Sequence, residues 1–128
     1  MRSSLNLIIT LWAISIGAVS YLSLTPSIEF PVNFTKADLA YHFLAYFWIS
    51  ALPFLSFQRS KIALVSAIIM VPFGVSLELA QILVSGRFFS VTDLGANIFG
   101  VFWGAVCGRY LMFIFMRGKL YSKLSIRQ

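Results

Sequence analysis

Four long apolar runs, separated by short polar connectors, constrain this chain more than any other feature of its sequence. They cover about residues 5–24, 39–57, 62–84 and 94–113. A hydrocarbon core of about 30 Å needs roughly 20 mostly apolar residues in each crossing helix, so every run is long enough for one crossing. We therefore predict an all-α protein, an integral membrane four-helix transmembrane bundle.

The composition agrees with this assignment and excludes other classes. Hydrophobic residues make up 59% and charged residues 11% of the 128 positions, whereas a soluble domain is roughly 45–50% apolar and about 25% charged. The length leaves room for one membrane domain over residues 1–128, with a basic tail at 117–128. The single Cys107 allows no intramolecular disulfide and no cysteine metal cluster.

The net charge of +6 reflects membrane topology and not a nucleic-acid partner, because half of the ten basic residues lie from Arg109 onward and no soluble basic domain exists. Basic residues are retained on the cytoplasmic side of a membrane. With four crossings, one side holds eight of them: Arg2, Arg59, Lys61, Arg109, Arg117, Lys119, Lys123 and Arg127. Lys36 and Arg87 lie on the other side. We expect a multi-pass protein of the cell (cytoplasmic) membrane with both termini in the cytoplasm.

The first run exceeds the 7–15 apolar residues of a usual signal peptide, so we expect it to remain as a span. Pro53 and Pro72 fall inside the second and third runs, where each removes a backbone donor and favours a kink. Gly86 lies in the last connector, where a glycine can adopt positive φ.

Polar residues in and beside the runs fall on one face of each predicted helix. Spacings of three or four residues group them as Asp38, His42 and Tyr46; Glu78 and Gln81; and Asp93 and Asn97. His42, Glu78, Gln81 and Asn97 reach the same outer third of the bilayer. Because ionisable side chains are costly in lipid, they turn toward each other or toward water. We predict one outward-facing polar pocket, with Asp93 also capping the last helix.

Small residues continue the polar stripe of the last helix. Ala96, Gly100, Gly104 and Gly108 recur every four residues, a pattern that permits close helix packing in membranes. The ladder is either a seam inside the bundle or a face for a second copy or another partner.

The stretches "DLAYHFLAY" and "ELAQILVSGRFFSVTDLGANIFG" resemble the VanZ-like membrane proteins, over about residues 36–108. The family pattern has Asp and His opening one helix, then Glu-x-x-Gln, Gly-Arg, Asp-x-x-x-Asn and a Gly-rich last helix. The matching residues are Asp38, His42, Tyr46, Glu78, Gln81, Gly86, Arg87, Asp93, Asn97 and Gly100. This chain has Leu39 where the family usually has Lys, and Lys36 stands nearby. The resemblance implies a small envelope protein, in a family named for a member linked to teicoplanin resistance.

The residue types suggest binding or processing of an anionic envelope lipid or lipid-linked precursor. The planar guanidinium of Arg87 can donate two parallel hydrogen bonds to a phosphate, and the ammonium group of Lys36 offers a single positive charge. His42, Glu78 and Asp93 are the catalytic candidates, because imidazole and carboxylates exchange protons. The binding candidates are Lys36, Asp38, Tyr46, Gln81, Arg87 and Asn97.

Catalysis is less favoured than binding, since Ser85, Ser90 and Thr92 lie nearby without a motif that pairs one of them with His42. His42, Glu78 and Asp93 have ligand chemistry for a divalent ion, but their spacing is not specific, and we expect neither metal nor cofactor. The alternative is a non-enzymatic accessory or scaffold protein whose polar cluster only fixes helix packing. A proton-coupled transporter is least favoured, because the inner half offers only Cys107 and Arg109.

Overall fold

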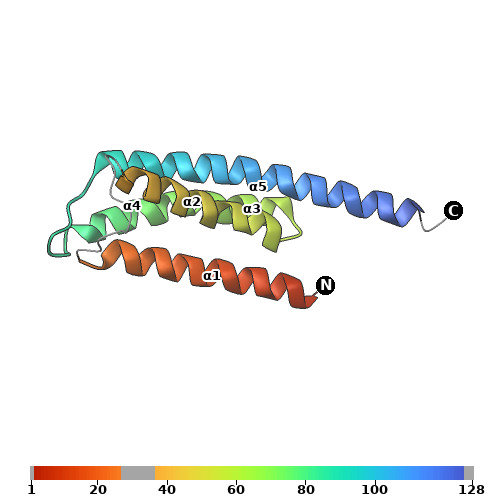
Figure 1. The fold of residues 1–128 in the computed structure, drawn as a ribbon, viewed down its shortest axis with the longest axis horizontal. Helices are drawn as coiled ribbons and strands as arrows, with labels where there is room; N and C mark the ends of the chain where they lie inside the picture. Colours follow the sequence, from red (N-terminus) through yellow and green to blue (C-terminus); the bar gives the residue numbers. More distant parts are fainter. Residues whose placement is uncertain (1, 27–36, 126–128) are drawn as a thin grey trace.

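The computed structural model describes the backbone of residues 2–26 and 37–125, and the side chains of residues 5–26 and 37–117. Its helices are α1 (Arg2–Leu24), α2 (Ala37–Ser56), α3 (Ser60–Ile68), α4 (Met70–Gln81) and α5 (Val91–Ser125). Within these ranges there is no strand, so the predicted all-α class is confirmed. α1 begins and α5 ends at the same end of the bundle (Figure 1).

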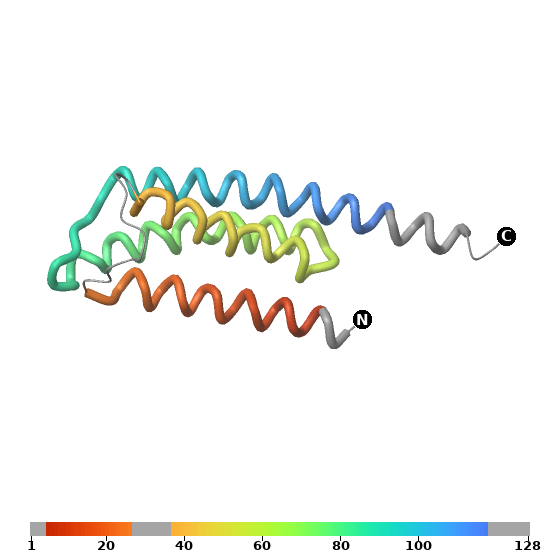
Figure 2. Tube along the Cα trace, in the orientation of Figure 1, coloured from red at the N-terminus to blue at the C-terminus, as the bar shows by residue number. Residues whose placement is uncertain are grey.

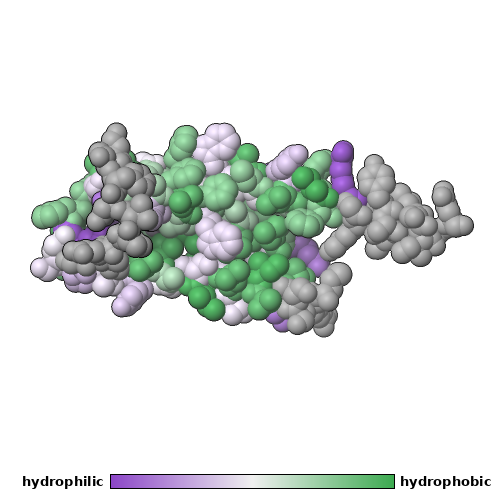
Figure 3. All heavy atoms as spheres, in the orientation of Figure 1, coloured by the Kyte–Doolittle hydropathy of each residue, from purple (hydrophilic) through white to green (hydrophobic). Residues whose placement is uncertain are grey.

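Four stretches of helix are long and apolar enough to cross a membrane. They are Leu5–Leu24, Ala37–Ser56, Ser60–Gln81 and Val91–Arg117, and the third combines α3 with α4. The chain is a multi-pass membrane protein. On the face shown in Figure 3, hydrophobic side chains cover most of the middle of the molecule, and the most hydrophilic ones lie toward its two ends.

Several predicted boundaries differ from the observed ones; the second and third spans, for example, each begin two residues earlier than predicted, at Ala37 and Ser60. The third span ends at Gln81 instead of residue 84, because a series of turns begins at Ile82. The fourth begins at Val91 instead of residue 94, and its helix continues far beyond residue 113 to Ser125. Most of the segment predicted as a basic tail, 117–128, therefore continues α5, while residues 126–128 lie outside the described part.

The two prolines in the spans act differently. α3 and α4 are separated at Ile69, three residues before Pro72, which has no N–H to donate back to the carbonyl of Ile68. α2 continues through Pro53 without interruption. The carbonyl that Pro53 leaves without its helical donor belongs to Ile49, and the indole Nε1 of Trp12 in α1 donates to it at 2.8 Å. A neighbouring helix thus satisfies the freed backbone group.

The glycine ladder of α5 forms a seam with α2 inside the chain, and the two helices run side by side (Figures 1 and 2). A Cβ atom on Gly100 would lie 2.5 Å from the carbonyl oxygen of Phe43, and one on Gly108 would lie 2.8 Å from that of Ala51. Gly104 faces the carbonyl of Phe47 in the same way. An association of two copies through these glycines would require α2 to leave the seam.

α1 lies at the edge of the bundle (Figure 2). None of the side chains in its span is fully buried. Trp12, Ile16 and Val19 pack against the hydrophobic core, and directed polar contacts add to this partly buried interface. Besides the bond from Trp12, the indole of Trp48 in α2 donates to Ser15 Oγ at 3.1 Å. Further bonds reach the end of α1 from α4 and the loop after it.

We expect Gly104→Ala to destabilise the protein by about 1–3 kcal/mol, because the added methyl group meets the backbone of Phe47. Gly95→Ala is the matched control, since a Cβ atom there meets nothing within 4 Å. Thermal unfolding in detergent should show a lower melting temperature for the first variant and an unchanged or higher one for the second. Equal melting temperatures would contradict the assignment of a tight seam.

Candidate functional site

Side chains from three helices meet at the end of the bundle where α4 connects to α5. His42 lies in the second turn of α2, Glu78 in the last turn of α4, and Asn97 in the second turn of α5. The α2–α5 seam sets this meeting, because Gly100 lies three residues after Asn97 and contacts the backbone of Phe43. These three predicted site residues are brought together.

Asn97 links the other two side chains. Its Oδ1 lies 3.0 Å from Nδ1 of His42, and its Nδ2 donates to Oε1 of Glu78 at 3.5 Å. Glu78 is 1% exposed and Asn97 2% exposed. An ionised carboxylate can only accept hydrogen bonds, so it orients the amide nitrogen toward itself and the amide oxygen toward His42. Nδ1 of His42 is then the donor in this pair.

Asp93 completes the cluster from the first turn of α5. Its Oδ2 lies 3.9 Å from Nε2 of His42, and its side chain is 21% exposed. The prediction that Asp93 caps the helix is wrong: α5 begins at Val91, and Ser90 Oγ accepts the backbone N–H of Asp93 at 3.2 Å. Both residues are good N-cap types, and the observed start makes Ser90 the cap.

One ligand atom from each of His42, Glu78 and Asp93 lies within 4.8 Å of the other two. The arrangement of one imidazole and two carboxylates fits acid–base chemistry or a divalent cation. Oε2 of Glu78 is buried and has no hydrogen-bond partner in the described part of the chain.

Tyr46 and Ser50 carry the same stripe of α2 deeper into the membrane. Both are buried, and neither Tyr46 Oη nor Ser50 Oγ has a hydrogen-bond partner among the described residues. The Tyr46 ring fits against Gly74 of α4, where a Cβ atom would approach it to 2.9 Å. Sequence reasoning missed Ser50 and Gly74, although Ser50 continues the spacing of four residues from Asp38 through His42 and Tyr46.

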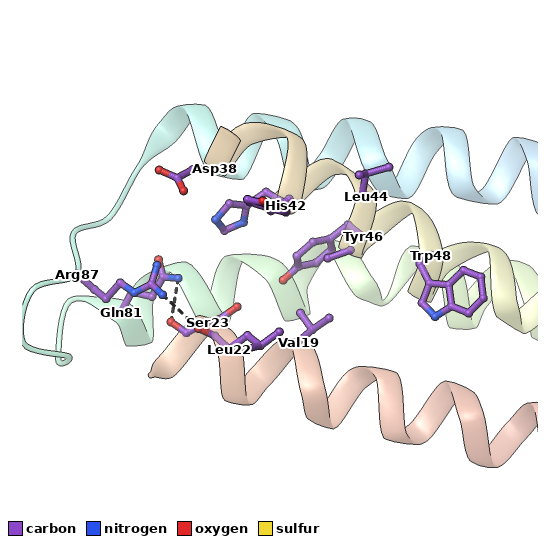
Figure 4. A pocket seen from close by; sticks show the side chains of 12 residues that line it. Val19, Leu22, Ser23, Asp38, His42, Leu44, Tyr46, Trp48, Gln81 and Arg87 are labelled. Carbon is purple, nitrogen blue, oxygen red and sulfur yellow. Dashed lines mark hydrogen bonds between the residues drawn. The ribbon is translucent and has the colours of Figure 1, made fainter. Parts of the chain in front are cut away.

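Gln81 and Arg87 do not join the cluster but bind the end of α1. Gln81 Nε2 donates to the carbonyl of Ser23 at 3.1 Å. Arg87 donates from Nε and Nη2 to the carbonyl of Thr25 at 3.3 and 3.2 Å, and from Nη2 to that of Leu22 at 3.3 Å. The last carbonyls of a helix lack internal donors and favour a cation. These bonds reach from α4 and its loop to α1 (Figure 4).

A pocket of about 350 Å³ lies between α1, α2 and the end of α4 (Figure 4). Its polar lining includes Asp38, His42, Gln81 and Arg87, and its apolar lining includes Val19, Leu22, Leu44, Ala45 and Trp48. Tyr46 also lines it. The exposed Asp38 lies at the polar end, and the apolar walls follow α1 and α2 deeper into the span.

Two further predicted residues lie in connectors. Gly86 has a φ of 80°, which confirms the expected positive φ and explains a glycine at this turn. Lys36, predicted to bind ligand, lies outside the described residues.

Comparisons of the chain with models of protein families, with curated proteins and with solved structures gave no match.

We expect Asn97→Leu to cost about 1–3 kcal/mol, because it leaves the buried Glu78 without its side-chain donor. Glu78→Met in the same molecule should recover part of that loss, since both polar partners are then gone. Unfolding measurements on the wild type, both single variants and the double variant give the coupling energy. Strict additivity would mean that the Asn97–Glu78 contact contributes nothing to stability.

Proposed function

We propose that the pocket binds an anionic envelope lipid or a lipid-linked precursor at the outer leaflet. The supporting observation is the division of its lining into a polar end near Asp38, His42 and Arg87 and apolar walls along α1 and α2. A lipid has the same division between headgroup and chain. Pockets for small molecules are likewise mostly apolar, with a few polar groups that fix orientation.

Arg87 is the group best suited to hold a phosphate in this proposal. Its Nε and Nη2 are engaged by α1, while Nη1 makes no hydrogen bond to the described residues. A phosphate oxygen would accept from Nη1 and leave the bonds to α1 in place. The exposed carboxylate of Asp38 would repel a bare phosphate. A headgroup that also carries hydroxyl or amine donors therefore suits the polar end best.

Binding is better supported than catalysis. Ser90 Oγ caps α5 and lies 2.8 Å from the Thr92 hydroxyl, so neither hydroxyl is positioned by His42. His42 instead contacts Asn97, Glu78 and Asp93. We propose that these side chains set the shape and charge of the polar end, and we assign no reaction step to them.

The resemblance to VanZ-like proteins is part of the same proposal. Asp38, His42, Glu78, Asp93 and Asn97 belong to the resembling pattern, and four of these five are in contact around His42. Residues of one motif that gather at one site are consistent with a shared role. A link to glycopeptide susceptibility would follow if the bound molecule is a cell-wall precursor.

A scaffold protein is the second candidate, and a specific observation favours it. Gln81 and Arg87 bind backbone carbonyls of α1, and Asn97 joins α5 to α2 and α4. Such contacts fix helix packing without any ligand. A scaffold should fail on Gly104→Leu but tolerate His42→Ala, whereas a ligand-binding site should lose function with His42→Ala in a folded protein.

We expect Ala45→Phe to reduce lipid retention by at least about tenfold, because the larger side chain would fill part of the pocket in which the lipid is proposed to bind. Ala13→Phe, on the exposed face of α1, is the control. Native mass spectrometry of the purified proteins would compare phosphate-bearing lipid on each, at melting temperatures that show both to be folded. Equal retention by both variants, or none by the wild type, would overturn the lipid proposal.

We also propose that Arg87 and the α4–α5 loop face the outside, because eight of the ten basic residues lie on the opposite side. In a Cys107→Ala background, a membrane-impermeant thiol reagent should label Ser85→Cys on intact cells. Ser60→Cys, at the start of α3, should react only after the cells are opened. The reverse pattern would invert the topology.

A further inference from the structure

We infer that His42, Glu78 and Asp93 form a binding site for a divalent metal cation, of the class that takes nitrogen and oxygen ligands, such as Zn²⁺. One ligand atom from each residue lies within 4.8 Å of the other two, although the residues come from three different helices. The inference stands on this cluster and does not depend on the lipid proposal.

The hydrogen bonds of Asn97 prepare the histidine for a metal. The amide turns its oxygen to His42, so Nδ1 carries the proton and a neutral imidazole keeps its lone pair on Nε2. Metal-binding histidines typically donate their other ring N–H to an oxygen in this way. Here Nε2 lies 3.9 Å from Oδ2 of Asp93. Two electron-rich atoms thus face each other, and a cation between them removes their repulsion.

Glu78 supplies the second, independent observation. Its side chain is 1% exposed, and Oε2 has no hydrogen-bond partner among the described residues. A buried carboxylate oxygen without a partner costs free energy, and in a membrane protein such a group has a function more often than elsewhere. Oε1 accepts from Asn97 and lies 3.7 Å from Nδ1 of His42, so the carboxylate stands beside the imidazole and still has an oxygen without a donor in the described part of the chain.

The charge of the cluster suits a divalent ion better than a single proton. If both carboxylates are ionised, protonation of His42 leaves a net charge of −1 at this depth. A divalent cation with a neutral imidazole leaves none. Because isolated charge is expensive in a medium of low dielectric constant, the neutral arrangement is the more stable one.

The donor set restricts the kind of metal. One imidazole with two carboxylates suits Zn²⁺ or Mn²⁺ better than Mg²⁺ or Ca²⁺, which prefer oxygen alone. Three protein ligands leave a position open for water or for an oxygen of a bound molecule. Tetrahedral zinc bonds of about 2.0–2.1 Å place ligands about 3.4 Å apart. The observed separations, 3.9 Å between His42 Nε2 and Asp93 Oδ2 and up to 4.8 Å within the set, therefore require a closing movement, to which the partly exposed Asp93 side chain can contribute.

Zn²⁺ alone, titrated by calorimetry into chelator-treated, untagged protein in detergent, tests this inference. Cys107→Ala should be the background, so that no thiolate competes. We expect one Zn²⁺ per chain, a higher melting temperature with Zn²⁺, and at least about tenfold weaker binding for Asp93→Asn and for Glu78→Gln. Thr92→Val, an exposed neighbour of Asp93, should bind like the background protein. Asp93→Asn keeps the inference testable where Glu78→Gln does not fold.

A proton as the occupant of the cluster is the competing account. It predicts no saturable Zn²⁺ binding and no effect of Zn²⁺ on the melting temperature, and either result would overturn the inference. Unchanged affinity in both Asp93→Asn and Glu78→Gln would overturn it as well. Ala45→Phe should bind Zn²⁺ with unchanged affinity, so a failure of the cation site and a failure of the lipid pocket are distinguishable.

Discussion

The close contact between α2 and α5 is the constraint on which the rest of the structure depends. Gly100, Gly104 and Gly108 bring the backbones of the two helices together, as no residue with a side chain could at the same spacing. Asn97 precedes this seam by one turn and is therefore held against His42. Wider separation of the helices would open the polar cluster, because a hydrogen bond of 3.0 Å tolerates little displacement.

The lipid environment explains how α1 is attached to the other helices. No hydrophobic force drives helices together in a bilayer, so α1 is held by side-chain packing and by hydrogen bonds. Pro53 frees a carbonyl in α2 for Trp12, and the last carbonyls of α1 accept from Gln81 and Arg87. The pocket lies between α1 and α2, beside these contacts.

Much of the fold and part of the site can be predicted from the sequence. Run lengths predict the four spans, and spacings of three or four residues place His42, Glu78 and Asn97 on facing stripes. The partners of Arg87 could not be predicted in this way, because backbone carbonyls of a distant helix leave no pattern in a sequence. The choice between Ser90 and Asp93 as the cap likewise depends on where the helix starts. These two suitable side chains are only three positions apart in the sequence.

His42 connects the two parts of the outer end, since it lines the pocket and also contacts the buried cluster. Glu78 and Asp93 do not line the pocket, so their charge would act on a bound molecule from behind the imidazole. If the proposed cation is held beside a neutral His42, it offsets this negative charge, and an anionic headgroup can approach Arg87. Without a bound cation, and with His42 neutral, the carboxylates of Asp38, Glu78 and Asp93 would repel an anionic headgroup. In the proposed function, the cluster would therefore influence which headgroups the pocket accepts, through His42 at its lining and through the charge behind it.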